Sequence, residues 1–328
     1  MPSREGKAGA REQRGITMIY RTRALDLCLR SPRVLALIAI GLTCVLAAQG
    51  QTSAPELKVA AIQFRSSLDV GANCKRMTDL LNQLATEGVQ VAVFPECALT
   101  GYYMGPTVPI PEKDIAAAEE RLRETCRDKK IAVVFGSVYK VNGHAYDGAT
   151  VLNSRGELVE RYGKIYLAGE KWAVPGNHIA YFELEGVPST VTICHDARYP
   201  ELVRLPAMEG ALIDYHISAA FSLKDEFKIA PYRAQMMARA VENGVFVVMA
   251  NVPANQDLTG SHGQSRIIAS DGNVVKEASI FGEDILISTL TLKSGKPVWP
   301  QNSLKGPLGD WWRSGVEWMM KNRHRQLD

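Results

Sequence analysis

The chain has 328 residues, of which 46% are apolar and 22% are charged, a composition that supports a large buried core. Its 16 prolines and 27 glycines exclude a collagen-like or broadly disordered protein. The formal net charge is +3, but residues 1–33 alone carry eight Lys or Arg against three Asp or Glu, a net of +5. The remaining residues therefore have a net charge of −2, so the basic character does not indicate a nucleic-acid-binding face.

The first expected element is an uncharged apolar segment of 15 residues at 34–48, which follows the basic stretch. A bilayer-spanning helix needs roughly 20 apolar residues, whereas a signal peptide needs a basic start and roughly 7–15 apolar residues before a cleavage site of small residues. We therefore expect residues 1–50 to be a basic leader with a signal peptide, cut after Ala47, Ala48 or Gly50. The protein would then be exported, to a periplasm or the medium. An uncleaved N-terminal membrane anchor is the alternative.

After a linker at residues 51–56, apolar strand-like runs alternate with segments of helical periodicity. This alternation predicts an α/β fold whose central strands are covered on both faces. Because no composition shift interrupts residues 57–292, we expect a single domain there, closed by a β-rich end with a turn at Asp271-Gly272. Strands are expected near 57–64, 89–94, 131–137, 147–153, 157–161, 187–193, 211–218 and 245–251, and helices near 69–87, 112–130, 201–209 and 227–242.

Residues 293–328 form a C-terminal extension rich in tryptophan. Trp311, Val316 and Met319/Met320 are spaced as an apolar stripe on a short helix. Such a stripe covers the domain's own surface or packs on a neighbouring subunit, and the sequence leaves both interpretations open.

Four cysteines lie beyond the leader, and none has the CxxC spacing of a structural zinc site. A body of this size holds together without disulfides, so we expect mostly free thiols. The sequence also contains no GxSxG, HExxH, Walker A or GxGxxG string. We therefore expect neither a metal nor a cofactor.

Glu96, in FPECALTGYY (94–103), is the first candidate for chemistry because it follows an apolar strand by one proline. Functional groups of α/β proteins gather where strands end, and a partly desolvated carboxylate there is a usable general base. Taken alone, an exposed loop glutamate is an equally valid interpretation.

Two further candidate points follow. Lys164 and Glu170 lie in the Gly/Pro-rich loop RYGKIYLAGEKWAVPG (161–176), where a fixed ammonium can stabilise an oxyanion. Surface positions are the alternative.

Cys194, in VTICHDARYPEL (191–202), ends a strand just before an expected helix, where backbone N–H groups favour the thiolate nucleophile. An inert buried cysteine is the alternative. Because adjacent residues of an extended chain point to opposite faces, we expect His195 to be a pocket wall or to support the residues of the site from behind.

Taken in order, these motifs resemble the nitrilase superfamily of carbon–nitrogen hydrolases. The resemblance rests on FPE followed by TGY, on a lysine in a loop that ends in PG, and on Cys-x-Asp-x-Arg-aromatic-Pro-Glu. It extends through ARAVENGVFVVMAN (238–251) and GQSRIIASDGNVV (263–275) and covers about residues 57–292. It implies a four-layer α-β-β-α sandwich, and subunits that pair as a homodimer or a higher homo-oligomer.

The resemblance also implies roles for individual residues. Glu96 matches the general base, Lys164 the triad lysine and Cys194 the nucleophile. Glu170 matches a second glutamate that helps to position the substrate, and the backbone N–H of His195 would be the second oxyanion donor beside Lys164.

The chain departs from parts of the family pattern. Gly163 replaces the arginine or lysine that often precedes the triad lysine. His195-Asp196 replaces the Trp-Glu of true nitrilases, which favours the amidase and N-carbamoyl-amine hydrolase branches. Arg198 lacks the second arginine with which D-amino-acid carbamoylases grip a carboxylate, so we expect it to pair with Asp196 or Glu201.

The sequence thus predicts a hydrolase that cleaves a linear amide or N-carbamoyl amine through a cysteine thioester. Its partner would be a small-molecule substrate, with no nucleic acid and no membrane for the mature body. Two alternatives stay open: acyl transfer from the thioester to an amine, and a catalytically silent member that binds a ligand.

Overall fold

The computed structural model describes residues 54–103, 105, 111–220, 224, 229–293 and 295–327. The predicted leader, its cleavage site and residues 51–53 of the linker lie outside the described residues, so the signal peptide stays a prediction. The chain divides into two compact units, Met1–Ala54 and Pro55–Asp328. All of the elements below belong to the second unit.

Two sheets of six strands each form the centre of this unit, and each has parallel strands in its middle. The first sheet has the order β12 (Asp284–Thr291), β1 (Glu56–Gln63), β2 (Val91–Val93), β3 (Ala132–Val141), β4 (His144–Leu152), β5 (Leu158–Gly163). The second has the order β11 (Val274–Glu277), β10 (Arg266–Ile268), β9 (Phe246–Asn251), β8 (Ile213–Ser218), β7 (Val187–Ile193), β6 (Phe182–Leu184).

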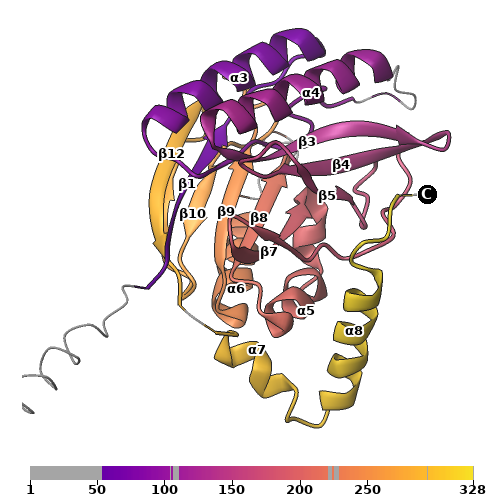
Figure 1. Ribbon diagram of the computed structural model, residues 1–328, viewed down its shortest axis with the longest axis vertical. Helices are drawn as coiled ribbons and strands as arrows, with labels where there is room; N and C mark the ends of the chain where they lie inside the picture. The colour runs from indigo at the N-terminus through magenta and orange to yellow at the C-terminus, as the bar shows by residue number, and fades with distance from the viewer. Residues whose placement is uncertain are drawn as a thin grey trace, which may run out of the picture. The chain divides into compact units, whose positions relative to one another are not determined.

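Helices cover the outer face of each sheet. The pair α3 (Val70–Thr86) and α4 (Glu112–Lys129) lies over the first sheet, and α5 (Glu201–Glu209) and α6 (Ile229–Asn243) lie over the second (Figure 1). Apolar clusters fill the space between the two sheets and between each sheet and its helices. This arrangement confirms the predicted α-β-β-α sandwich.

The two faces of each central strand enter different apolar clusters. In β1, Val59 and Ala61 face the second sheet, whereas Ala60 and Ile62 face the outer helices. Both faces are therefore buried, which is why these strands are continuous apolar runs and do not alternate with polar residues.

The C-terminal residues form α7 (Val298–Ser303) and α8 (Gly309–Asn322), and α8 packs on α5. Trp312, Val316, Met319 and Met320 make the packed face, so the prediction that Trp311 belongs to the stripe is wrong. Trp312 precedes Met319 by seven residues, nearly two full turns, and therefore shares its face. Trp311 is rotated by about 100° from Trp312 and is 59% exposed.

None of the described helices combines the length and the apolar character that a bilayer-spanning helix needs. The four cysteines of the described chain, Cys74, Cys97, Cys126 and Cys194, are buried free thiols. This confirms the prediction of free thiols for these positions.

A polar network lies on the outer face of the second sheet. Thr192 Oγ1 is 3.0 Å from Asp214 Oδ1 and 2.9 Å from His216 Nδ1. Burial raises the pKa of Asp214 to about 7, although the Thr192 hydrogen bond opposes the shift. Burial also lowers the pKa of His216 to about 3. Both side chains are therefore uncharged in the folded state at mildly acidic pH.

We expect Asp214→Asn to remove a pH dependence from the stability of the fold. The folded state keeps the Asp214 proton up to about pH 7, whereas the unfolded chain releases it near pH 4. The stabilisation is therefore complete below about pH 4 and is lost as the pH rises to about 7. The difference in free energy of unfolding between variant and wild type should grow across this range by up to about 4 kcal/mol in favour of the variant.

Urea unfolding at pH 5 and pH 8 measures this difference. Asp79→Asn, at an exposed aspartate of α3, is the matched control and should change stability by less than about 0.5 kcal/mol at either pH. A difference for Asp214→Asn that stays constant between the two pH values would contradict the assignment.

Candidate active site

Glu96 is fully buried, which excludes the exposed-loop interpretation. It lies in a tight turn after β2, where the next residue, Cys97, has a positive φ of 52°. Gly136 on β3 leaves room for this turn, because a Cβ there would lie 2.3 Å from the Cys97 nitrogen. Gly136 N–H also donates to the Pro95 carbonyl at 3.0 Å. The turn is therefore fixed by backbone contact with the neighbouring strand.

The Glu96 carboxylate connects the two sheets. Its Oε1 accepts a hydrogen bond from Lys164 Nζ at 2.7 Å, and its Oε2 accepts one from the Ala219 backbone N–H at 2.6 Å. Lys164 follows β5 of the first sheet, whereas Ala219 follows β8 of the second. Both oxygens thus have donors, which orients the carboxylate.

Lys164 is 1% exposed, so the surface interpretation is wrong. Its backbone N–H donates to the Asp147 carbonyl at 2.8 Å, and its carbonyl accepts from Gly176 N–H at 2.9 Å. A Cβ at Gly163 would lie 2.9 Å from the Leu327 side chain and 3.1 Å from Gly176 Cα. This close packing explains why glycine precedes the lysine in this chain.

Three carboxyl groups surround the Lys164 ammonium. Glu170 Oε1 lies 2.5 Å, Glu96 Oε1 2.7 Å and Asp147 Oδ2 3.3 Å from Nζ. Although burial opposes the charge, Glu96 and Asp147 raise the pKa of Lys164 well above its ordinary value. Lys164 is therefore a permanent cation in a buried site.

Glu170 is held by several donors. It accepts hydrogen bonds from the Tyr102 hydroxyl at 2.8 Å and from Ala168 N–H at 2.5 Å, in addition to Lys164. Burial raises the pKa of Glu170, but the Lys164 ammonium and these hydrogen bonds outweigh burial and lower it below the ordinary value. Glu170 is therefore ionised at neutral pH, and it anchors the lysine.

Glu96, Asp147 and Glu170 also offer oxygen atoms within 4.8 Å of one another, a spacing that can suit a metal ion. The Lys164 ammonium contacts all three carboxyl groups, at 2.5–3.3 Å. An organic cation thus takes the position that a metal ion would take.

Cys194 lies at the junction of β7 and a short 3-10 helix, η1 (Cys194–Arg198), and has a positive φ of 46°. For a non-glycine residue this backbone conformation costs on the order of 1–3 kcal/mol and is typical of functional sites. The Ser218 side chain hydrogen-bonds the thiol, and the next residue, Ala219, donates to Glu96. Parallel pairing of β7 with β8 therefore brings Cys194 to the carboxylate.

The prediction that the Cys194 thiolate is favoured is wrong for the resting site. Burial and the Glu96 carboxylate raise the pKa of Cys194 to about 12, although Lys164 opposes them. η1 has only five residues, too short to offset these effects with its dipole. The resting thiol is neutral, so it needs a base that removes its proton during attack.

Asp196 ties the cysteine segment to the lysine loop. It accepts hydrogen bonds from the Tyr162 hydroxyl at 2.8 Å and from Tyr166 N–H at 2.9 Å, on either side of Lys164. The predicted ion pair of Arg198 with Asp196 or Glu201 is wrong, because Arg198 is exposed and neither pair occurs among the described residues. Backbone and phenol donors satisfy Asp196, so it needs no arginine.

His195 does not join the charged cluster of Glu96, Lys164 and Glu170. It is partly buried, and its ring lies 5.9 Å from that of Tyr199. Tyr199 in turn stacks on Tyr166, with ring centroids 3.3 Å apart. This aromatic group lies beside the Cys194 segment, and the wall position of the His195 side chain stays a prediction.

Asp147 and the contact of Tyr102 with Glu170 were not predicted from the sequence. Asp147 lies within β4, where it is fully buried, and it also accepts a weak hydrogen bond from the Cys97 thiol at 3.7 Å. Asp147 is the one carboxylate of β4, and a carboxylate within a buried strand was the available signal. Tyr102 belongs to the TGY motif, but its contact with Glu170 depends on a loop 68 residues further along.

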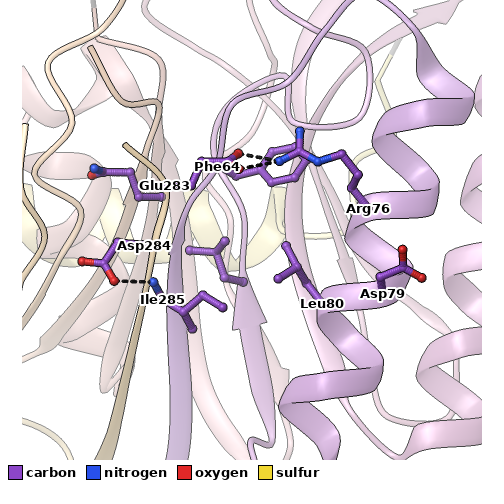
Figure 2. Close-up of a pocket in the computed structure, with 9 residues that line it drawn as sticks. Phe64, Arg76, Asp79, Leu80, Glu283, Asp284 and Ile285 are labelled. Carbon is purple, nitrogen blue, oxygen red and sulfur yellow. Dashed lines mark hydrogen bonds and ion pairs between the residues drawn. The ribbon is translucent and has the colours of Figure 1, made fainter. Parts of the chain in front are cut away.

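A separate cavity of about 330 Å³ lies between α3 and the β1–β12 edge of the first sheet (Figure 2). Figure 2 shows the Arg76 guanidinium over the Phe64 ring, 4.4 Å from its centroid. Arg76 also pairs with Glu283 at 2.6 Å. None of the residues around Lys164 lines this cavity. Glu283 already neutralises the charge of Arg76.

The chain matches the sequence model of the carbon-nitrogen hydrolase family over residues 58–298. It is 27% identical to the 2-oxoglutaramate amidase of Bacillus subtilis (strain 168) over 224 residues, which cover 67% of this chain and 85% of that protein. It is 26% identical to the omega-amidase NIT2 of Mus musculus over 250 residues, which cover 72% and 89%.

Among solved structures, an amidase from Nesterenkonia sp. is similar at 25% identity with a TM-score of 0.67, covering 79% of this chain and 95% of that one. The similarity in both sequence and structure therefore extends over most of each relative.

We expect Glu96→Gln to make Cys194 more reactive toward an alkylating agent. Removing the carboxylate charge takes away a cause of the raised pKa of Cys194 and leaves Lys164 to favour the thiolate. Alkylation by iodoacetamide at pH 8 should accelerate at least about threefold, since each unit by which the pKa falls is worth about tenfold in thiolate. Mass spectrometry of the Cys194 peptide measures the rate.

The matched control is Glu160→Gln, at a largely buried carboxylate that hydrogen-bonds His178 outside the cluster. It should leave the Cys194 alkylation rate within about twofold of wild type, because screened distant charges contribute little. An unchanged or slower rate in Glu96→Gln would show that Glu96 does not set the state of the thiol.

Proposed function

Because the chain belongs to the carbon-nitrogen hydrolase family, we propose that it hydrolyses small linear amides through a thioester on Cys194. The family and the fold predicted from the sequence are confirmed. The observation that carries the proposal is the convergence of Glu96, Lys164 and Glu170 in one buried cluster whose charges act on the Cys194 thiol.

The first half-reaction forms the thioester. Glu96 removes the proton of Cys194 as the sulfur attacks the amide carbon, and the carbonyl oxygen becomes an oxyanion. Lys164 and the His195 backbone N–H stabilise that oxyanion. Glu96 then gives the proton to the nitrogen, the carbon–nitrogen bond breaks, and ammonia or an amine leaves. Because the resting thiol is neutral, the reaction requires a base close enough to Cys194 to remove its proton.

The second half-reaction releases the acid. Glu96 takes a proton from water while the oxygen attacks the thioester carbon, and the same donors stabilise the second oxyanion. Collapse of this intermediate breaks the carbon–sulfur bond and returns the proton to Cys194. Glu170 keeps Lys164 in place throughout, since it accepts from Nζ at 2.5 Å.

The names of the relatives support a substrate with a terminal carboxamide. One relative is named for 2-oxoglutaramate, an amide at the end of a short carbon chain, and another is an omega-amidase. We therefore rank short linear carboxamides first. N-carbamoyl amines, which the GEKWAVPGN segment indicated, belong to the same test panel.

Pairing of subunits and export through the N-terminal leader stay predictions. Exposed Trp311 and Trp318 on α8, 59% and 47% accessible, support a subunit contact on that side. Size-exclusion chromatography with light scattering measures the oligomeric state, and N-terminal sequencing of the exported protein measures cleavage.

We expect Cys194→Ala to lose amide hydrolysis down to the background rate while the protein still folds. The variant lacks the sulfur on which the proposed mechanism forms the thioester. Ammonia release from a panel of short amides, 2-oxoglutaramate and N-carbamoyl amines measures activity, and circular dichroism measures folding.

Cys74→Ala is the matched control, because Cys74 is a buried thiol on α3, remote from the cluster. It should retain activity within about twofold, since it removes one buried sulfur without touching the site. A folded Cys194→Ala variant with full activity would overturn the proposal. With wild type, added hydroxylamine should yield a hydroxamate, as a reactive acyl intermediate requires.

A further inference from the structure

The residues around Lys164 include one carboxyl group, that of Asp147, that the proposed mechanism does not use. Asp147 on β4 is fully buried, lies 3.3 Å from Lys164 Nζ through Oδ2, and hydrogen-bonds the Glu96 carboxyl group. No step described above assigns it a task.

The charges of the cluster do not balance if every group is ionised. Glu96, Asp147 and Glu170 would carry three negative charges against the single positive charge of Lys164. All four side chains are at most 1% exposed, so water cannot screen a net charge of −2. Holding one proton on a carboxyl group relieves this repulsion, as in other buried carboxyl pairs.

Hydrogen bonding indicates which group holds the proton. Glu170 accepts from Lys164, Tyr102 and Ala168, and Glu96 accepts from Lys164 and Ala219, all at 2.5–2.8 Å. From the described residues, Asp147 accepts a longer contact from Lys164 at 3.3 Å and a weak one from the Cys97 thiol at 3.7 Å.

Asp147 therefore has the least stabilised negative charge of the three carboxyl groups. Burial and the Glu96 carboxylate also raise the pKa of Asp147 well above its ordinary value.

We infer that Asp147 is a neutral carboxylic acid and a positioning residue. Its O–H group donates a hydrogen bond to Glu96, and one N–H of Lys164 stays available to the oxyanion. This inference rests on the proposed function. Glu96 and Glu170 each take one of the three ammonium protons. A neutral acceptor holds the third only weakly, so that proton can turn to the substrate when the oxyanion forms.

The neutral state also matters for the nucleophile. Glu96 and Glu170 already raise the pKa of Cys194. A further anion at Asp147 would oppose formation of the thiolate-like sulfur. Keeping Asp147 protonated removes this opposition while its hydrogen bond still orients Glu96.

The test compares kcat/KM against pH for wild type, Asp147→Asn and Asp147→Ala. The groups that face Asp147 are Glu96, Lys164, Glu170, Tyr102 and Cys97. Asparagine is neutral and its amide can donate to Glu96, so it should retain at least about a tenth of wild-type activity, with the acid limb moved by less than about 0.5 pH unit. Alanine leaves Glu96 unpositioned and should lose about 10–100-fold, with the acid limb moved to higher pH because the donor to Glu96 is gone.

Three results would overturn the inference. An acid limb that moves down by a pH unit or more in Asp147→Asn would mean that an ionised carboxylate had been removed beside Glu96. Equal losses in the two variants would exclude rescue by a neutral donor. Near wild-type activity in Asp147→Ala would show that positioning is not needed.

Infrared spectroscopy supplies a readout that does not depend on activity. The difference spectrum of wild type minus Asp147→Asn at pH 9 should contain the carbonyl band of a protonated carboxylic acid, and its absence would overturn the inference. Asp214→Asn serves as the control, because the band of Asp214 should disappear as the pH rises through about 7. If Asp147→Asn fails to fold, a protonated-carboxyl band that persists at pH 9 in the Asp214→Asn variant gives the same answer.

Failure of the inference is distinguishable from failure of the proposed function. Ammonia release by wild type that is lost in Cys194→Ala supports the function whatever Asp147 does. The infrared band reports on Asp147 even if no amide of the panel is hydrolysed.

Discussion

The buried ammonium of Lys164 is the interaction on which the site depends. Without it, the carboxyl groups of Glu96, Asp147 and Glu170 could not lie within 4.8 Å of one another in a buried site. Each of them enters from a different segment of the first sheet or its loops, so this one cation fixes the relative positions of those segments. The fold supplies the remaining contact through Ala219 of the second sheet.

The nucleophile is placed by strand pairing more than by charge. β7 and β8 run parallel and end together, so Cys194 and Ser218 meet at the same edge of the second sheet. Asp196 then fastens the cysteine segment to both sides of Lys164 through Tyr162 and Tyr166. The two sheets, Lys164 and Asp196 thus position the Cys194 sulfur near the Glu96 carboxylate in this carbon-nitrogen hydrolase.

Much of this arrangement could be predicted from the sequence, because central strands buried on both faces are apolar runs and the residues that carry the chemistry follow strand ends. Glu96, Lys164 and Cys194 were found in that way. Asp147 was missed because its neighbours along β4 resemble a structural strand and its partners are brought to it only by tertiary packing. The charge state of Cys194 was misjudged for the same reason, since the count of buried carboxyl groups depends on that packing. Trp311 was misplaced because a one-residue step on a helix changes the face by about 100°.

The packing behind Lys164 links the lysine to the far end of the described chain. Leu327 is buried among Tyr139 and Tyr146 and closes against Gly163, while Asn177 holds the Gln326 carbonyl at 3.0 Å. The last described residues therefore pack against the backbone that precedes Lys164. Proteolysis or a fusion partner that displaces Leu327 and Gln326 would remove these contacts and could shift Lys164 without altering the residues that face the substrate. An affinity tag is therefore better placed elsewhere.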